Sequence, residues 1–406
     1  MERTMQQTES APQSSNSSVL TSLQVGGLVF AAIGIILAVF GAVTNLERFF
    51  PSYLLAFLFW LEVTLGCLGF LLVTGLIQGD WTVATQRILS AGARVVPLMV
   101  ILLLPILFDL GGLYPWVDNA AGGTTHAYLN VPFFAVRTAL SFVIWIFLAY
   151  LIAHWNFQLD SDNDGKYLRW IGRAAGLGLV LFVITASFAA FDWTMSLTDT
   201  WFSSLYGLLV ISRMAVAGFA FTAVILALVW KQSGLEAIMS QRLKNDMANL
   251  LLATVMVWMY MQFMQFLIMW YGNLPKEVAW YVLRLTGGWG GLAVALVVLH
   301  FFVPFFVLIL PGPNRTMGLV ATVGVLLLVM HYVGLYWVVM PSFTPTLAFH
   351  WLDIALVLGM GGIWVALFAW LLKQHRLLPA NNPSVDHAIE RAEHEHELLE
   401  EIGMAS

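Results

Sequence analysis

Almost every window of about twenty residues in this chain is apolar enough to cross a lipid bilayer. Hydrophobic residues make up 60% of its 406 residues and charged residues only 10%, and the mean hydropathy is +0.83. A water-soluble domain carries about a quarter of its residues as charged side chains, far more than this chain has. The sequence therefore predicts an integral membrane protein.

The apolar runs are continuous and lack the alternation of apolar and polar residues that a membrane β-barrel requires. We therefore expect an all-α membrane protein with about ten transmembrane helices. The third of these spans is the shortest, and Pro97 and Pro105 predict a kink in it. The expected spans cover residues 23–43, 53–77, 95–110, 131–153, 171–191, 204–230, 248–271, 289–310, 317–340 and 350–372.

The two ends of the chain are polar. Residues 1–22 are rich in Ser, Gln and Thr and are expected to form a disordered tail without the basic start of a secretory signal, so the first span is expected to be retained. Most of the 18 Lys and Arg residues fall in loops on one side of the expected spans, such as 166–173 and 242–244. The positive-inside rule then predicts that both termini are cytoplasmic.

The acidic C-terminal tail, residues 377–406, includes a predicted amphipathic helix at 384–402. We expect this helix to lean on a partner subunit, with metal binding by its histidines as the alternative. The apolar face consists of Ile389, Ala392 and Leu399. The three histidines are His387, His394 and His396.

Several function classes are disfavoured by composition. Cys67 is the single cysteine, so the chain cannot form an internal disulfide, a four-cysteine iron–sulfur site or a zinc site of several thiolates. We expect no metal site, and the lack of a glycine-rich phosphate loop after a strand argues against nucleotide binding. No basic patch supports nucleic-acid binding. Membrane lipids are the expected surroundings of the apolar spans.

Ionisable residues inside the apolar runs are the strongest functional signal, because burying each one in a bilayer is costly. Four fall near mid-bilayer, and a second group falls toward the outer side. The mid-bilayer residues are Glu62, Arg213, His300 and His331; the outer ones are Asp109, Arg137, Asp192, Glu277, Arg284 and Asp353. We predict a proton path that consists of Glu62, Arg213, His300, His331, Asp192 and Asp353.

These residues also allow other interpretations. Arg137 and Asp109 are suited to an ion pair that locks two spans together, and Asp192 to bonding the backbone of the next loop. His300 and His331 fall at similar depths, which suits either two ligands of a haem b or a proton-carrying pair. The aromatic residues that crowd these two histidines in the sequence favour the pair.

The seventh span carries a polar stripe of four residues. It suits either hydrogen bonds between helices or a path for water or a quinone headgroup. The stripe consists of Trp258, Tyr260, Gln262 and Gln265.

Two long motifs resemble signatures of a known family. They are FDWTMSLTDTWFSSLYG at 191–207 and WMYMQFMQFLIMWYGNLPKEV at 258–278. Shorter matching stretches lie at 52–60, 102–116, 128–137, 300–310, 336–341 and 377–385. Together they resemble the smaller NrfD-like membrane subunit of bacterial alternative complex III, of the polysulfide reductase membrane-subunit type, over nearly the whole chain.

The resemblance implies a division of the chain and a role. It implies two four-helix bundles, at 53–191 and 192–340, flanked by the first span at 23–52 and the tenth at 341–376. It also implies a multi-pass subunit of the bacterial inner membrane, within a complex that oxidises menaquinol or ubiquinol. The subunit would contribute a proton path and a scaffold, without a catalytic residue or a redox cofactor of its own.

The same resemblance implies partners and their cofactors. The expected partners are a larger NrfD-like membrane subunit, an iron–sulfur subunit and c-type cytochrome subunits. Iron–sulfur clusters and haem c are expected in those partner subunits, and quinol is expected as the substrate of the whole complex.

Two rival functions remain open at this point. The chain itself binds quinol in the first, with Asp109, Arg137 and Asp192 as a quinone or ion-pair site that holds and deprotonates the headgroup. The second rival is an independent secondary transporter whose two bundles form an internal repeat. The spans lack matching Gly or Pro breaks in the two halves, which argues against the transporter.

Overall fold

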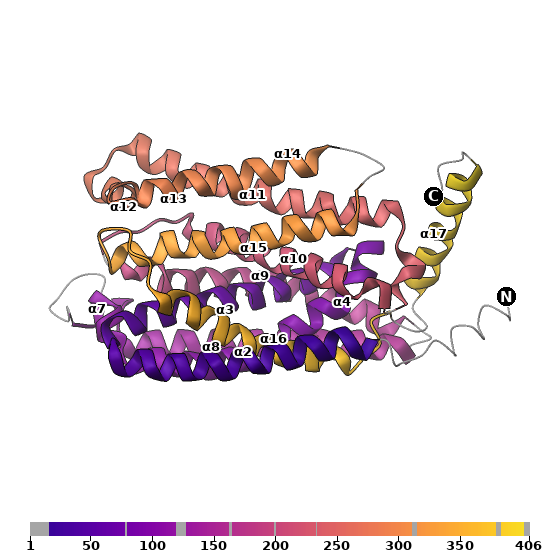
Figure 1. Ribbon diagram of the computed structural model, residues 1–406, viewed down its shortest axis with the longest axis horizontal. Coiled ribbons are helices and arrows are strands. Elements are labelled where there is room, and N and C mark those ends of the chain that lie inside the picture. The colour runs from indigo at the N-terminus through magenta and orange to yellow at the C-terminus, as the bar shows by residue number, and fades with distance from the viewer. Residues whose placement is uncertain are drawn as a thin grey trace.

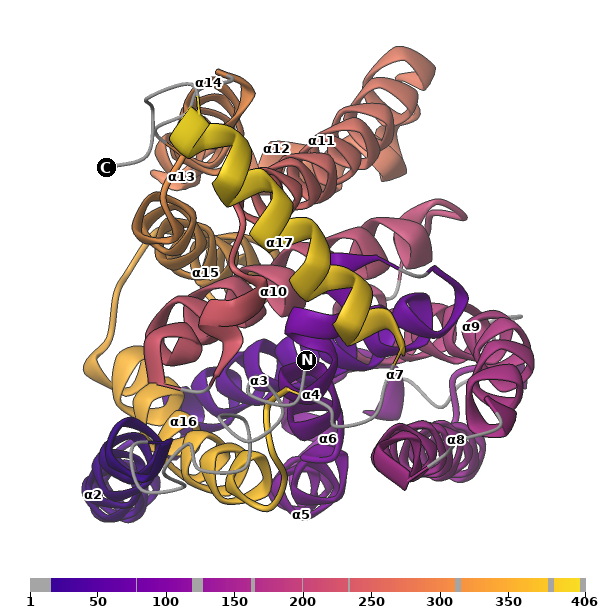
Figure 2. The same ribbon diagram turned by 90° about the vertical axis from the view of Figure 1, so that its right-hand side faces the viewer.

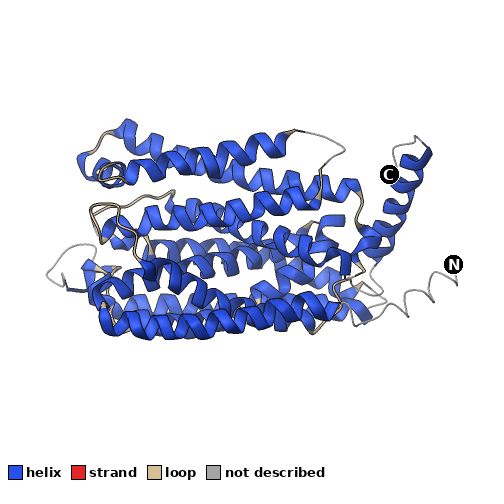
Figure 3. Cartoon of the chain, in the orientation of Figure 1, coloured by secondary structure: helices blue, strands red, loops and turns tan. Residues whose placement is uncertain are grey.

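The computed structural model describes residues 16–77, 79–118, 127–161, 165–198, 200–232, 234–310, 315–378 and 383–401. Helices make up nearly all of these residues, and no strand occurs among them (Figure 3). Ten helical spans in this part of the chain are long and apolar enough to cross a membrane. The predicted class, an all-α multi-pass membrane protein, is confirmed.

The spans are built from helices that run along the long axis of the molecule (Figure 1). The longer helices are α2 (Asn16–Thr44), α3 (Leu46–Leu76), α4 (Asp80–Ala93), α5 (Val96–Leu107), α8 (Val131–Gln158), α9 (Lys166–Trp193), α10 (Tyr206–Val229), α11 (Gln241–Gly272), α15 (Met317–Val339) and α16 (Trp351–Lys373). One further span joins α13 (Trp289–Ala295), the π-helix η6 (Leu296–Phe302) and α14 (Val303–Ile309). The connecting and terminal helices are α6 (Leu110–Leu113), α7 (Pro115–Asp118), α12 (Pro275–Leu285) and α17 (Pro383–Glu401), with the 3₁₀ turns η2 (Leu159–Ser161), η3 (Met195–Leu197), η4 (Trp230–Gln232), η5 (Leu235–Ile238) and η7 (Met340–Ser342).

The helices pack in two groups of four spans and one outer pair (Figure 2). One group consists of α3, α4–α5, α8 and α9, and the other of α10, α11, α13–α14 and α15. Helices α2 and α16 pack mainly on each other and contact the groups chiefly through α3, with further contacts to α4 and α10. We call the end of the bundle opposite α17, where α3 and α16 begin, the far end (Figure 1).

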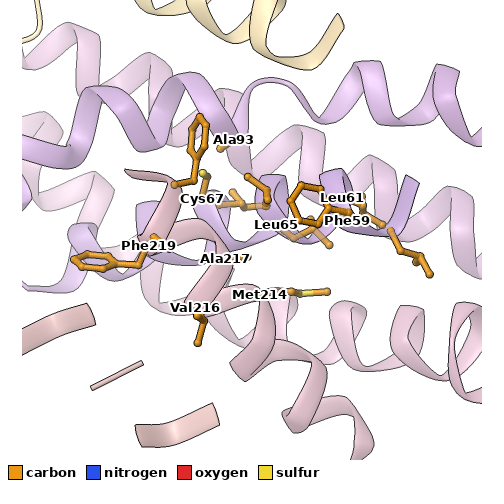
Figure 4. Packing of buried hydrophobic residues seen from close by; sticks show 14 of the residues in the cluster. Phe59, Leu61, Leu65, Cys67, Ala93, Met214, Val216, Ala217 and Phe219 are labelled. Atoms are coloured by element: carbon orange, nitrogen blue, oxygen red, sulfur yellow. The ribbon is translucent and has the colours of Figure 1, made fainter. Parts of the chain in front are cut away.

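The central contact joins α3 to α10. Most of the buried side chains around it are apolar, and Figure 4 shows Cys67 and Leu65 close to Ala217 on the facing helix. A Cβ atom on Gly66 would overlap the carbonyl oxygen of Met214, and one on Gly218 would overlap the backbone of Gly66. Small residues let membrane helices approach closely, which makes van der Waals contact and short hydrogen bonds available between them. The two groups of helices therefore meet backbone to backbone along this line.

Glycines also set the pairing of α2 with α16. Gly27, Gly34 and Gly41 follow one another at intervals of seven residues, so they lie on one face of α2. That face meets Gly359 and other residues of α16, and a Cβ atom on Gly34 would overlap the Cα atom of Gly359. The remaining faces of α2 carry exposed apolar side chains that suit contact with lipid.

We predict that Gly34→Val separates α2 from α16, because a side chain at this position overlaps backbone that cannot move away. The free energy of unfolding in detergent should fall by about 1–3 kcal/mol. Gly26→Val is the matched control, because a Cβ atom there meets nothing within 4 Å. Equal unfolding temperatures for the two variants would contradict this packing.

The first helix begins earlier than predicted. Residues 16–22, assigned to a disordered tail at 1–22, belong to α2, while residues 1–15 lie outside the described part of the chain. Leu20 in this turn is buried, and the Lys373 ammonium donates hydrogen bonds to Thr21 Oγ1 at 2.9 Å and Gln24 Oε1 at 2.8 Å. Polar residues that lowered the hydropathy of this stretch therefore bind the end of α16.

The third span is longer than the predicted 95–110, since α4 and α5 together run from Asp80 to Leu107. The predicted irregularity lies between the two helices, because Pro97 cannot donate a hydrogen bond to Ala93 and its ring crowds that carbonyl. The polar residues that masked α4 in the sequence are buried, and its two charged residues form ion pairs. Arg87 binds both carboxylate oxygens of Asp160 at 2.6 and 2.7 Å.

The C-terminal helix α17 crosses the end of the bundle and packs on α4 and η5 (Figure 2). Val385 and Ala388 are buried there, and Arg391 forms an ion pair with Asp80 at 2.7 Å. The predicted helix is confirmed, but its buried face meets its own chain. Of the predicted apolar face, Ile389 and Ala392 are half-buried, whereas the side chain of Leu399 lies outside the described residues.

Candidate functional site

A buried ion pair occupies the middle of the contact between α3 and α10. The guanidinium of Arg213 donates to both carboxylate oxygens of Glu62, from Nε at 2.7 Å and from Nη2 at 2.5 Å. Both side chains are almost wholly buried, with exposed fractions of 3% and 2%. Two parallel charge-assisted hydrogen bonds fix the geometry of the pair and offset part of the cost of removing the charges from water.

His331 on α15 extends this ion pair toward the second group of helices. Its Nε2 atom lies 3.5 Å from Glu62 Oε2, a little beyond ordinary hydrogen-bond length. The ring packs against Phe59 and is fully buried, and neither ring nitrogen has a hydrogen-bond partner among the described residues. A small side-chain movement would therefore bring this imidazole into hydrogen-bond contact with the carboxylate.

His300 lies on the π-helix η6, and Pro304 explains this wider turn. An α-helix would need a hydrogen bond from residue 304 to the carbonyl of His300, but proline has no N–H and its ring crowds that carbonyl. The His300 ring stacks on Trp258 with centroids 4.0 Å apart and planes 18° apart. Its two ring nitrogens are buried, and neither bonds to a described residue. π-Turns of this kind are frequent at functional sites.

A cavity of about 350 Å³ lies beside these groups, within the second group of helices. Arg213 and His300 form part of its wall, together with Gln262. The rest of the wall is mostly aliphatic or aromatic, contributed by Trp258, Met259, Phe263, Phe266, Tyr281, Leu285, Gly290, Ala293, Val294, Leu296, Val297, Val298, Gly334, Trp337 and Val338. The four predicted mid-bilayer residues therefore lie close together. Arg213 and His331 adjoin the Glu62 carboxylate, and Arg213 and His300 line the cavity.

The polar stripe of α11 divides between the two interpretations given above. Trp258 and Gln262 contribute to the cavity wall, whereas Gln265 accepts a hydrogen bond from Ser203 at 2.7 Å. Tyr260 is 55% exposed and points away from the cavity wall. The stripe thus contributes to a cavity wall and to a hydrogen bond between α11 and the segment that precedes α10.

Arg137 does not pair with Asp109, which was one of the interpretations that the sequence left open. Arg137 instead binds both oxygens of Asp192, each at 2.8 Å, and donates to the carbonyl of Tyr128 at 2.9 Å. Its guanidinium also lies over the Tyr128 ring, 3.9 Å from the centroid. Asp109 is half-buried before α6 and forms no ion pair within the described part of the chain. The three residues proposed as a quinone site therefore do not form one polar cluster.

Asp353 belongs to a separate network at the far end. Its carboxylate accepts hydrogen bonds from Ser52 at 2.5 Å, Arg48 at 2.7 Å and the Tyr336 hydroxyl at 3.3 Å. It also accepts one from the backbone N–H of His350, which caps the first turn of α16. This network joins α3, α15 and α16 and satisfies the buried carboxylate. Sequence reasoning missed Ser52 and Tyr336 because neither residue is unusual in its own span.

Arg284 at the end of α12 is a buried cation without a carboxylate partner among the described residues. It donates to the carbonyl of Val338 at 2.6 Å and lies 3.6 Å from the centroid of the Trp280 ring. Burial lowers the pKa of Arg284 to about 9, so the guanidinium stays charged at neutral pH. These contacts join the C-terminal end of α12 to α15, whose Trp337 indole donates a hydrogen bond to the Arg284 carbonyl.

Comparisons with known proteins add no family to this description. No protein-family model matches the chain, and no curated protein matches it either. The fold and the site define a multi-pass helical membrane protein with a charged, buried centre.

We predict that Glu62→Gln or Arg213→Gln alone destabilises the protein by about 3–5 kcal/mol, because each leaves one buried charge without a partner. The double variant Glu62→Gln/Arg213→Gln should recover much of that loss. Thermal unfolding of the four proteins in one detergent gives the coupling. Additive losses in the double variant would show that the two side chains do not stabilise each other.

Proposed function

We propose that this chain is the proton-conducting membrane subunit of a quinol-oxidising complex of the alternative complex III type. One observation carries the proposal: the Glu62–Arg213 pair lies at the middle of the bundle, beside an imidazole whose nitrogens bond to no described residue. A carboxylate and an imidazole 3.5 Å apart are suited to exchanging a proton, because an imidazole can take up a proton at one ring nitrogen and release one from the other.

Energetics argue against a purely structural reason for this centre. Replacing a buried ion pair by apolar residues of similar volume is often neutral or stabilising. Buried polar atoms without partners, such as the ring nitrogens of His300 and His331, add a further cost of about 1–3 kcal/mol for each group. A fold that keeps both features has a use for them beyond packing, and intramembrane ionisable groups commonly mark proton routes.

The proposed route follows the positions of the charged groups. His300 and the cavity adjoin Arg213, which holds Glu62, and His331 approaches Oε2 of the same carboxylate. Asp192 and Asp353 lie nearer the far end, in the ion pairs with Arg137 and Arg48. We propose that protons leave the mid-bilayer centre in that direction.

The wider assignment rests on the resemblance of the sequence motifs. The ten spans of the described residues, an even number, are consistent with both termini on one side, and the basic loops support our proposal that this side is the cytoplasm of a bacterium. The proposed partners are a larger NrfD-like subunit, an iron–sulfur subunit and c-type cytochromes that carry the redox cofactors. The far end would face outward, where the proton path releases its protons.

We predict that His331→Gln lowers quinol oxidation and proton release by about tenfold or more while the complex still assembles, because glutamine cannot carry a proton. His154→Gln is the matched control, since His154 is an exposed residue of α8. Both rates are measured on purified complexes with equal subunit content. An assembled His331→Gln complex with normal turnover and proton release would refute the proton path.

A further inference from the structure

The cavity beside His300 opens toward lipid. Val294 and Val298 from the α13–η6 segment and Phe263 from α11 belong to its wall, yet they are 63%, 42% and 49% exposed. These side chains lie on the outer surface of two helices that belong to membrane spans. A molecule dissolved in the bilayer can therefore reach the cavity sideways, without crossing an aqueous surface.

The size and the wall residues of the cavity suit a ligand that carries a planar ring. Its volume of about 350 Å³ lies in the range of small-molecule pockets. Aromatic side chains contribute from three elements, including Trp258 and Phe266 of α11 and Trp337 of α15. Aromatic rings favour offset-stacked or edge-to-face contacts with another ring, so these walls select a planar group over a bare alkyl chain.

The polar groups of the wall define the head of the ligand. His300 is 1% exposed, and both of its ring nitrogens lack partners among the described residues. A neutral imidazole has one donor and one acceptor, so it calls for a ligand that accepts and donates hydrogen bonds. The charge of Arg213 is balanced by Glu62, so the wall has no excess charge to attract an ionic head.

The depth of His300 in the membrane favours this ligand over a phospholipid. His300 lies near the middle of the span Trp289–Ile309, whereas a phospholipid keeps its charged head at the bilayer surface. A phospholipid tail in the cavity would leave both imidazole nitrogens without partners. We infer that the cavity binds a neutral, ring-headed lipid of the quinone or quinol class, with its ring between Trp258 and Trp337 and an oxygen substituent at His300. The proposed function assigns no ligand to this chain, so the inference goes beyond it.

The test uses the purified full-length chain in nanodiscs of synthetic phosphatidylcholine. The probe is a benzoquinone with a ten-carbon saturated tail, whose binding is followed by quenching of tryptophan fluorescence. Gly334→Leu should abolish the saturable part of the quenching, because its side chain fills the cavity. Gly318→Leu makes the same change at an exposed position of α15 and should bind the probe like the unaltered protein. His300→Ala should weaken binding roughly tenfold through the lost hydrogen bonds.

A second variant covers the case in which Gly334→Leu does not fold. Val294→Trp closes the lipid-facing opening from a position that is 63% exposed, and it should also abolish saturable binding. A ten-carbon alcohol, which has the tail but no ring, should not displace the probe.

Three results would overturn the inference. They are displacement by the alcohol, unchanged binding in folded Gly334→Leu or Val294→Trp protein, and a phospholipid as the molecule that native mass spectrometry finds retained by the unaltered chain but lost from these variants. Because the chain is studied without partners, binding can fail here while the proton path of the complex remains intact.

Discussion

The ion pair between Glu62 and Arg213 fixes the alignment on which the polar centre of this protein depends. It lies where the two groups of four helices meet, and the glycine contact of Gly66 with Gly218 brings the two backbones close enough for it to form. Because both hydrogen bonds are short and fixed in direction, the pair defines the register of α3 against α10. A shift of one helix along the other would leave two charges buried without partners.

The buried carboxylates of the far end and the buried histidines of the centre differ in their hydrogen bonds. At the far end, Asp353 and Asp192 are satisfied by arginines, hydroxyls or backbone N–H groups, and they join helices or cap them. At the centre, His300 and His331 keep ring nitrogens that bond to none of the described residues. The carboxylates join or cap helices, and the histidines have ring nitrogens that are free to bind a proton or a ligand in the two proposals made above.

The sequence was sufficient for the fold class and for the residues at mid-bilayer. Hydropathy located ten spans because lipid imposes a long apolar helix on each crossing, and burial cost singled out Glu62 and Arg213. The ends of elements were harder. Polar residues hid the start of α2 and most of α4, since Thr21 and Arg87 look solvent-exposed until their partners are known. Hydropathy has no term for such pairing.

The ion-pair partners and the cavity could not be predicted from the sequence, because hydropathy does not account for pairing between distant side chains. Arg137 pairs with Asp192 rather than with Asp109, and α17 packs on α4. Such contacts join segments far apart in the chain, and no local sequence pattern predicts them. The π-helix had a local signal, however, since Pro304 follows His300 by four residues. Reading that spacing as a forced break in helical hydrogen bonding would have marked His300 as the residue at an irregular, functional turn.

The central claim is that the polar centre exists for proton transfer rather than for stability. The most direct measurement compares the unaltered complex with Glu62→Met/Arg213→Met, which replaces the pair by apolar side chains of similar length. We predict an assembled complex with an equal or higher unfolding temperature, because the desolvation cost of two charges is gone. Proton release for each quinol oxidised should fall in that complex. A stable double variant that releases protons as the unaltered complex does would contradict the account.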